Sequence, residues 1–189
     1  MLQIEWNKKV LEHEMRIAHH SLSIIDRWIP IFVYINDIEI SGQEDIPEGD
    51  VSHLTSFFPE LMSIFMIIDP ERLGRKEFIY SRKNDNRVTG GGFEFTVELD
   101  KKTDTLTINH TNRGIREWRT VTIPLKEFAE GALSATKEVI SDIERISPYE
   151  SADDDLISLK MDYNTIRSWY EERYGVPVEV KYVIPERFY

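Results

Sequence analysis

Residues 93–123 carry the pattern that most constrains how this chain can fold. Apolar residues fill every second position from Phe93 to Leu99 and again from Leu106, with glutamate, threonine and asparagine between them. A period of two places one side of a strand in a core and the other side in water. Turn-forming residues separate the two runs at 100–104, and a third extended run ends at Ile123. The stretch therefore predicts a three-stranded antiparallel meander.

The rest of the chain supplies further strands and helices around this meander. Residues 29–40 predict a hairpin that turns at Asn36-Asp37, whereas residues 8–25 fit both a helix and a strand, with helix preferred. Further strands are expected at 77–81 and 178–184, and helices with apolar positions from Leu54 to Ile68, from Leu125 to Ile146 and from Leu156 to Tyr174. Pro59 lies inside the first pattern, so that helix either begins near Pro59 or kinks there.

The expected fold class is α+β. We expect a mainly antiparallel sheet of about five or six strands, with about three helices packed mostly on one of its faces. A chain of 189 residues is long enough for one domain with a core of its own. Residues 1–189 are therefore predicted to form a single α+β domain, with one candidate boundary at 147–152.

Gly131 interrupts the apolar stripe of the helix that is expected at 125–146. Glycine inside a helix costs about 1 kcal/mol relative to alanine. A close contact between this helix and the sheet would explain the glycine, because a side chain would then have no room.

The formal net charge is -11, and most of it lies in two segments. Residues 36–60 hold seven acidic residues and no lysine or arginine, and residues 138–155 hold seven more against Arg145 alone. A field of this sign repels nucleic acid and accelerates encounter with basic surfaces. We therefore expect a basic protein partner and no nucleic acid.

The composition also excludes several classes of function. The chain contains no cysteine, which excludes disulfides, thiolate nucleophiles and cysteine-ligated metals. The first residues lack the basic flank and apolar run of a signal peptide, and no apolar stretch approaches the roughly 20 residues of a membrane helix. A cytoplasmic location without membrane contact is expected.

The histidines do not form a metal-binding or catalytic pattern. His13 is followed by His19 and His20, but a helical zinc site of the metalloprotease type needs histidines four residues apart. His110 is in phase with the apolar residues of its strand, which predicts a buried ring rather than a base. We therefore predict no catalytic residue, no metal and no cofactor.

Trp118 is surrounded by three arginines, Arg113, Arg116 and Arg119. Arginine beside an exposed aromatic residue is typical of platforms for single-stranded nucleic acid. The net charge of residues 81–120 is only +2, however, so cross-strand ion pairs are the simpler explanation. Trp118 is out of phase with the apolar residues that follow it, which indicates that it faces away from the core or marks a bulge.

The order of these elements resembles that of small, acidic, cysteine-poor cytoplasmic proteins that protect bacteria against polymorphic or contact-dependent toxins. Four features carry the resemblance: the hairpin at Val33-Tyr34-Ile35-Asn36, the acidic loop before Leu54, the meander from Phe93, and the strand-to-helix junction at 121–125. Immunity proteins of this kind act by binding. The resemblance implies a non-enzymatic inhibitor whose acidic residues pair with the basic active site of a toxin, such as a nuclease, while aromatic residues anchor the contact.

The predicted partner-binding residues are the acids of the two charged segments and one aromatic residue. They are Asp37, Glu39, Glu44, Asp45, Glu48, Asp50, Asp153, Asp154, Asp155 and Trp118.

Two other classes of function remain open from the sequence. An enzyme with a scattered active site would bring a carboxylate together with two of four histidines, His13, His19, His53 and His110. An oligomeric structural module would bury three aromatic residues between copies of the chain, Trp118, Tyr170 and Tyr182.

Overall fold

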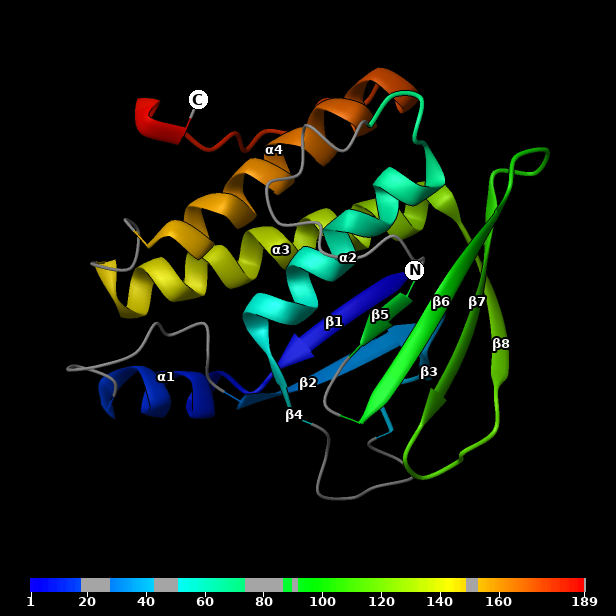
Figure 1. The fold of residues 1–189 in the computed structure, drawn as a ribbon, viewed down its shortest axis with the longest axis horizontal. Helices are drawn as coiled ribbons and strands as arrows, with labels where there is room; N and C mark the ends of the chain where they lie inside the picture. The colour runs from blue at the N-terminus through cyan, green and yellow to red at the C-terminus, as the bar shows by residue number, and fades with distance from the viewer. Residues whose placement is uncertain (18–27, 43–50, 74–86, 90–91, 149–152, 189) are drawn as a thin grey trace.

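The computed structural model describes residues 1–17, 28–42, 51–73, 87–89, 92–148 and 153–188 (Figure 1). Within these residues the chain is α+β, as the sequence predicts, with eight strands and four α-helices. The prediction of one sheet with five or six strands was wrong, because the strands form two separate antiparallel sheets. Periodicity identifies a strand but not its neighbour, so the division into two sheets could not be foreseen.

The first sheet contains the N-terminus of the chain. Its strands are β1 (Leu2–Trp6), β2 (Trp28–Ile35), β3 (Ile38–Glu39) and β4 (Val51–His53). The order is β1-β2-β3, and β4 pairs with the beginning of β2.

The predicted hairpin at 29–40 is confirmed as β2 and β3. Asn36 and Asp37 connect the two strands, with φ angles of 51° and 65°. Two consecutive positive φ angles are typical of the tight turn that matches the twist of the flanking strands, and asparagine and aspartate tolerate them well.

The second sheet confirms the predicted meander. Its strands are β5 (Arg87–Thr89), β6 (Phe93–Asp100), β7 (Thr105–Asn112) and β8 (Arg119–Pro124), in that order across the sheet. Phe95 pairs with His110, Val97 with Ile108, and the inward-facing residues of β6 and β7 are buried. The expected strand at 77–81 lies outside the described residues.

The helices are α1 (Lys8–Ile17), α2 (Leu54–Ile68), α3 (Leu125–Ile146) and α4 (Asp154–Tyr174). The preference for a helix in residues 8–25 is confirmed as far as residue 17, and residues 18–25 lie outside the described part of the chain. Helix α3 lies along β1, and α4 packs on α2 and α3 on the side away from the sheets (Figure 1). Among the described residues, no helix is both long and apolar enough to cross a bilayer.

The two long C-terminal helices begin and end where local sequence rules place their boundaries. The carboxylate of Asp153 accepts hydrogen bonds from the backbone N–H groups of Asp155 and Leu156, which caps α4. Gly175 ends α4 with a φ of 66°. The candidate domain boundary at 147–152 lies between α3 and α4, and these helices pack against each other.

The strand predicted at 178–184 is not present. This segment lies in the C-terminal tail, residues 176–188, which runs beside α4 and not beside another strand (Figure 1). Val178, Val180 and Tyr182 are half-buried and alternate with exposed residues, so the period of two is real. The prediction failed because helices cover the apolar side of this segment. The backbone groups of a helix are already hydrogen-bonded within the helix, so they cannot pair with a strand.

Gly131 makes the close approach that the sequence predicts. A Cβ atom at this position would lie 2.3 Å from the carbonyl oxygen of Leu2 and 2.7 Å from the Leu2 Cβ. The helix and β1 can therefore approach this closely only because the residue is glycine.

We expect Gly131→Ala to lower the free energy of unfolding by about 1–3 kcal/mol, because the overpacking of a backbone contact exceeds the gain in helix propensity. Ser134→Ala, at an exposed position of the same helix, is the matched control and should be neutral or slightly stabilising. Denaturant titration of both variants measures the difference. Equal stability of Gly131→Ala and the parent chain would contradict the contact.

Candidate functional site

The two sheets meet where β3 ends. The carboxylate of Glu39 accepts hydrogen bonds from the Ser41 hydroxyl and, at 3.1 Å, from the backbone N–H of Gly42. The Ser41 hydroxyl oxygen in turn accepts the N–H of Val33 at 3.1 Å. These bonds hold the chain in a tight turn, and Gly42 has a φ of 98° that favours glycine.

Gly42 lies directly against the end of β7. A Cβ atom on Gly42 would lie 2.9 Å from the Asn112 Cγ. The side-chain oxygen of Asn112 accepts hydrogen bonds from the N–H groups of Gly114, at 2.9 Å, and Ile115, at 3.1 Å. Asn112 thus starts the turn between β7 and β8. It also contacts Gly42, the residue that precedes 43–50 in the sequence.

The turn between β7 and β8 presents Trp118 to solvent. The side chain is 52 % exposed, which agrees with the prediction that it faces away from the core. Ile38, on β3, is a second large apolar residue with 50 % exposure.

A second contact joins the β2–β3 hairpin to the second sheet. The side-chain amide of Asn36 donates a 2.9 Å hydrogen bond to the carbonyl oxygen of Thr122 on β8. The hairpin is thus fixed to the second sheet at Asn36 and at Gly42. We call the exposed residues Asp37 and Ile38 of the hairpin, together with the turn 113–118, the hairpin–turn surface.

The predicted acids of the first segment have different environments. Asp37 is exposed in the hairpin turn, whereas Glu39 is half-buried and holds the turn at Gly42. Glu44, Asp45, Glu48 and Asp50 lie outside the described residues.

The predicted acids of the second segment have roles within the fold. Asp153 caps α4, and Asp154 lies 3.2 Å from the guanidinium of Arg187. Asp155 is half-buried in the first turn of α4. They therefore lie together at one helix end.

Bases from other elements also neutralise the acids of α3. Lys8 lies 2.5 Å from Glu138 and 3.2 Å from Asp142, and the hydrogen bond to Glu138 raises the pKa of Lys8. Glu144 pairs with Lys160 at 2.7 Å. The concentration of negative charge that the sequence shows in residues 138–155 is therefore offset in the fold by lysines of α1 and α4.

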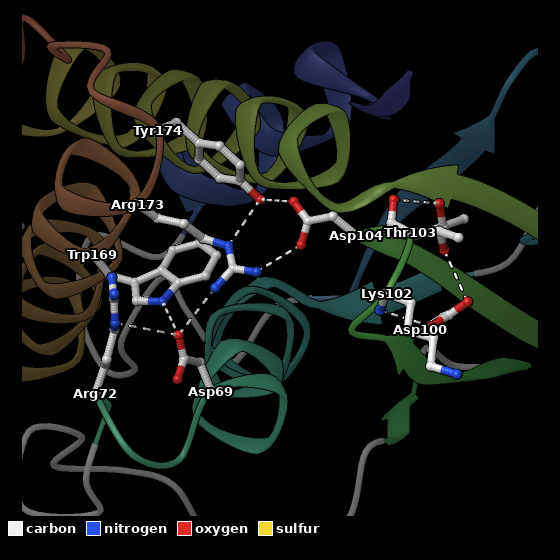
Figure 2. Close-up of polar contacts among 10 residues, drawn as sticks. Asp69, Arg72, Asp100, Lys102, Thr103, Asp104, Trp169, Arg173 and Tyr174 are labelled. Carbon is white, nitrogen blue, oxygen red and sulfur yellow. Dashed lines mark hydrogen bonds and ion pairs between the residues drawn. The ribbon is translucent and has the colours of Figure 1, made fainter.

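The most extensive polar network of the described residues surrounds Arg173 (Figure 2). Its guanidinium lies 3.4 Å from Asp69 and 2.6 Å from Asp104. Asp69 also accepts a hydrogen bond from the Trp169 indole at 3.0 Å, and Asp104 accepts one from the Tyr174 hydroxyl at 3.0 Å. Burial raises the pKa of Tyr174 to about 12, so this hydroxyl remains a donor at neutral pH.

The Arg173 network connects three distant segments of the chain. Asp69 follows α2, Asp104 lies in the β6–β7 turn, and Arg173 belongs to the last turn of α4. The backbone carbonyl of Asp104 also accepts the N–H of Leu125, the first residue of α3, at 2.8 Å. The network thus has a structural role, and the sequence contains no local signal for contacts between such remote residues.

A surface hollow of about 380 Å³ lies beside this network. Arg72, Ser168, Trp169 and Glu172 line it with Leu73, Asn164 and Thr165. Its polar groups come from one helix and one turn and include one base and one acid. We assign it no chemistry.

Two of the four histidines of the enzyme alternative have side chains that the structure describes, and they lie on different elements. His13 is exposed on α1 and His110 is 2 % exposed on β7, while His19 lies outside the described residues. The described ranges contain no group of three histidines or carboxylates that is placed to hold a metal ion.

The aromatic residues proposed for a self-interface do not form one surface. Tyr170 is buried and donates a 2.5 Å hydrogen bond to Glu130, and Tyr182 is half-buried against Tyr163. Only Trp118 of the three is exposed.

Comparison with protein-family models, with curated proteins and with solved structures finds no match to this chain. The geometry of its own residues is therefore the basis of every functional proposal below.

Asp162 is a buried carboxyl group that the sequence did not single out. Its side chain is 3 % exposed on α4, and burial raises its pKa to about 8. The pKa in the folded chain is thus above that of an unfolded aspartate, so the folded state binds the proton more tightly. Its stabilising contribution is complete below pH 4 and is lost as the pH rises to about 8.

We expect Asp162→Asn to raise the free energy of unfolding at pH 8 by at least about 1 kcal/mol, and to have little effect at pH 4. Glu172→Gln, an exposed neutralisation on the same helix, is the control and should change neither value. Denaturant titrations at both pH values measure the effect. A stability change in Asp162→Asn that is equal at pH 4 and pH 8 would contradict the raised pKa.

We expect Arg173→Lys to destabilise the fold by about 1–2 kcal/mol, because lysine cannot hold two carboxylates in a planar fork. Arg145 also bridges two carboxylates, Glu12 and Asp142, but is 57 % exposed. Arg145→Lys should therefore cost less than about 0.5 kcal/mol. Thermal denaturation measures the loss of stability in each variant. An equal loss in Arg173→Lys and Arg145→Lys would show that the Arg173 network contributes no more to stability than an exposed ion pair.

Proposed function

We propose that this chain is a non-enzymatic binding protein that inhibits a basic toxin domain, such as a nuclease. Binding occurs at the hairpin–turn surface. The acids of the first charged segment pair with basic residues of the partner, and Trp118 anchors the contact.

The contact between Gly42 and Asn112 is the single observation that supports this proposal most strongly. Gly42 is the described residue that immediately precedes 43–50 in the sequence, and it lies against Asn112, which starts the turn that exposes Trp118. A protein-binding surface commonly combines a central aromatic anchor with charged residues around it. Trp118 and Ile38 supply exposed apolar area, and Asp37 supplies an acid that the fold does not use for a helix cap.

The charge layout favours the first segment over the second. Lys8 and Lys160 offset the acids of α3, whereas residues 36–60 contain no lysine or arginine at all. Long-range attraction depends on the net charge of a region, because paired charges cancel within a Debye length. We therefore assign Asp153, Asp154 and Asp155 a secondary contribution to steering and the first segment the contact itself.

The partner can be identified by capture from the native host with the full chain as bait. The identified protein is then purified, and its binding to this chain is measured directly. The proposal requires a basic domain whose activity falls when the chain is added. A partner that is acidic, or whose activity does not change, would contradict it.

We expect simultaneous reversal of Glu44, Asp45 and Glu48 to lysine to slow association with this partner at least about tenfold at low salt. The difference should shrink at high salt, because screening removes long-range attraction. The matched control reverses three exposed acids near the C-terminus, Glu172, Glu179 and Glu186. Surface plasmon resonance measures the association rate of each triple variant. An equal decrease in the two variants would show that net charge, and not the location of these acids, controls association.

A further inference from the structure

The C-terminal tail is held by side chains in the manner of a bound peptide. The side-chain amide of Asn164 donates to the carbonyl of Tyr182 at 2.8 Å and accepts its N–H at 2.9 Å. Two helical turns further along α4, Glu171 accepts the N–H of Val178 at 2.7 Å, and Arg167, between them, donates to the Val178 carbonyl at 2.9 Å. An ion pair of 2.8 Å fixes Arg167 and Glu171 relative to each other.

Apolar contacts anchor the same tail. The ring of Tyr182 meets that of Tyr163 edge to face at 5.2 Å, and Ile184 is buried. Val178 and Val180 border a hollow of about 300 Å³ together with residues of α3 and α4, among them Leu133. The surface of α3 and α4 therefore holds an extended segment with apolar residues at alternate positions.

No backbone ladder joins the tail to the rest of the described chain. The backbone hydrogen bond from Phe188 to Pro185 lies within the tail, and the bonds to α4 are all made by side chains of that helix. Recognition of this kind does not depend on which molecule supplies the extended segment.

Gly175 connects α4 to the tail. Its backbone conformation determines the direction in which the tail leaves the helix. Its φ is 66°, and a Cβ atom there would meet nothing within 4 Å. The left-handed conformation, rather than packing, is therefore the requirement at this residue.

We propose that two copies of this chain exchange their tails, so that each tail binds the surface of α3 and α4 of the other copy. Every contact between the tail and these helices is then retained, and only the conformation at Gly175 changes. Within one chain the short connection gives the tail a high effective concentration at its own helices, which favours the monomer. Any change that strains Gly175 shifts the equilibrium toward the dimer.

The hinge variant Gly175→Val tests the equilibrium. A β-branched residue disfavours positive φ by about 1–2 kcal/mol, so the dimer dissociation constant should fall at least about tenfold. Gly175→Asn is the matched control, because asparagine tolerates this conformation, and it should behave like the parent chain. Sedimentation equilibrium over a range of concentrations measures both. Equal self-association of Gly175→Val and Gly175→Asn would overturn the proposal.

A cross-linking experiment shows whether the dimer forms by exchange of the tails. The chain has no cysteine, so single cysteines can be introduced without interference. One Gly175→Val chain carries Asp154→Cys and another carries Arg187→Cys, which places one thiol on α4 and the other on a tail. The side chains of these two exposed residues lie 3.2 Å apart. The two substitutions leave unchanged the residues of the hydrogen bonds and ring contact described above, which are Asn164, Arg167, Glu171 and Tyr182. With a short cross-linker for thiols, the mixture should give a covalently linked pair of the two different chains, and each chain alone should give none. A mixture that yields no such pair would overturn tail exchange.

Discussion

Helix α3 is the element through which the two sheets are held together. It begins immediately after β8, where the carbonyl of Asp104 accepts the N–H of Leu125, and it then passes over β1 at Gly131. The first residue of the helix is therefore fixed to the second sheet, and Gly131, about two turns further on, is fixed to the first sheet. A side chain at Gly131 would separate these two attachments, and its approach to Leu2 is closer than that of Gly42 to Asn112.

The charges of the chain divide into those that stabilise the fold and those that remain exposed. Arg173 draws together the end of α2, the β6–β7 turn and the end of α4, which periodicity does not predict to be neighbours. The acids of α3 similarly meet lysines of α1 and α4. Residues 36–60 differ, because they contain no lysine or arginine at all.

Local rules in the sequence predicted the elements of this fold but not their neighbours. Period-two alternation located β6, β7 and the β2–β3 hairpin, and cap chemistry located both ends of α4 at Asp153 and Gly175. The same alternation misassigned the tail, because it reports which side of a segment is apolar and not whether a strand or a helix covers that side. The short strand β1, with five residues, was not predicted. It precedes a stretch that fitted both a helix and a strand.

The candidate site was foreseen only in part. The phase of Trp118 relative to its strand predicted its exposure, and the charge count identified the acidic segment. Asn112, at the start of the turn that bears Trp118, contacts Gly42, which is 70 positions away in the sequence. No local pattern specifies a contact over that separation.

We propose that the acidic segment and the turn bearing Trp118 form one binding surface. Hydrogen–deuterium exchange of the chain, with and without the captured basic partner, distinguishes this surface from the others. We predict that the partner slows exchange in residues 37–50 and 113–120 together and leaves α4 and the tail unchanged. Protection confined to α4 and the tail, with neither of these two segments affected, would contradict it.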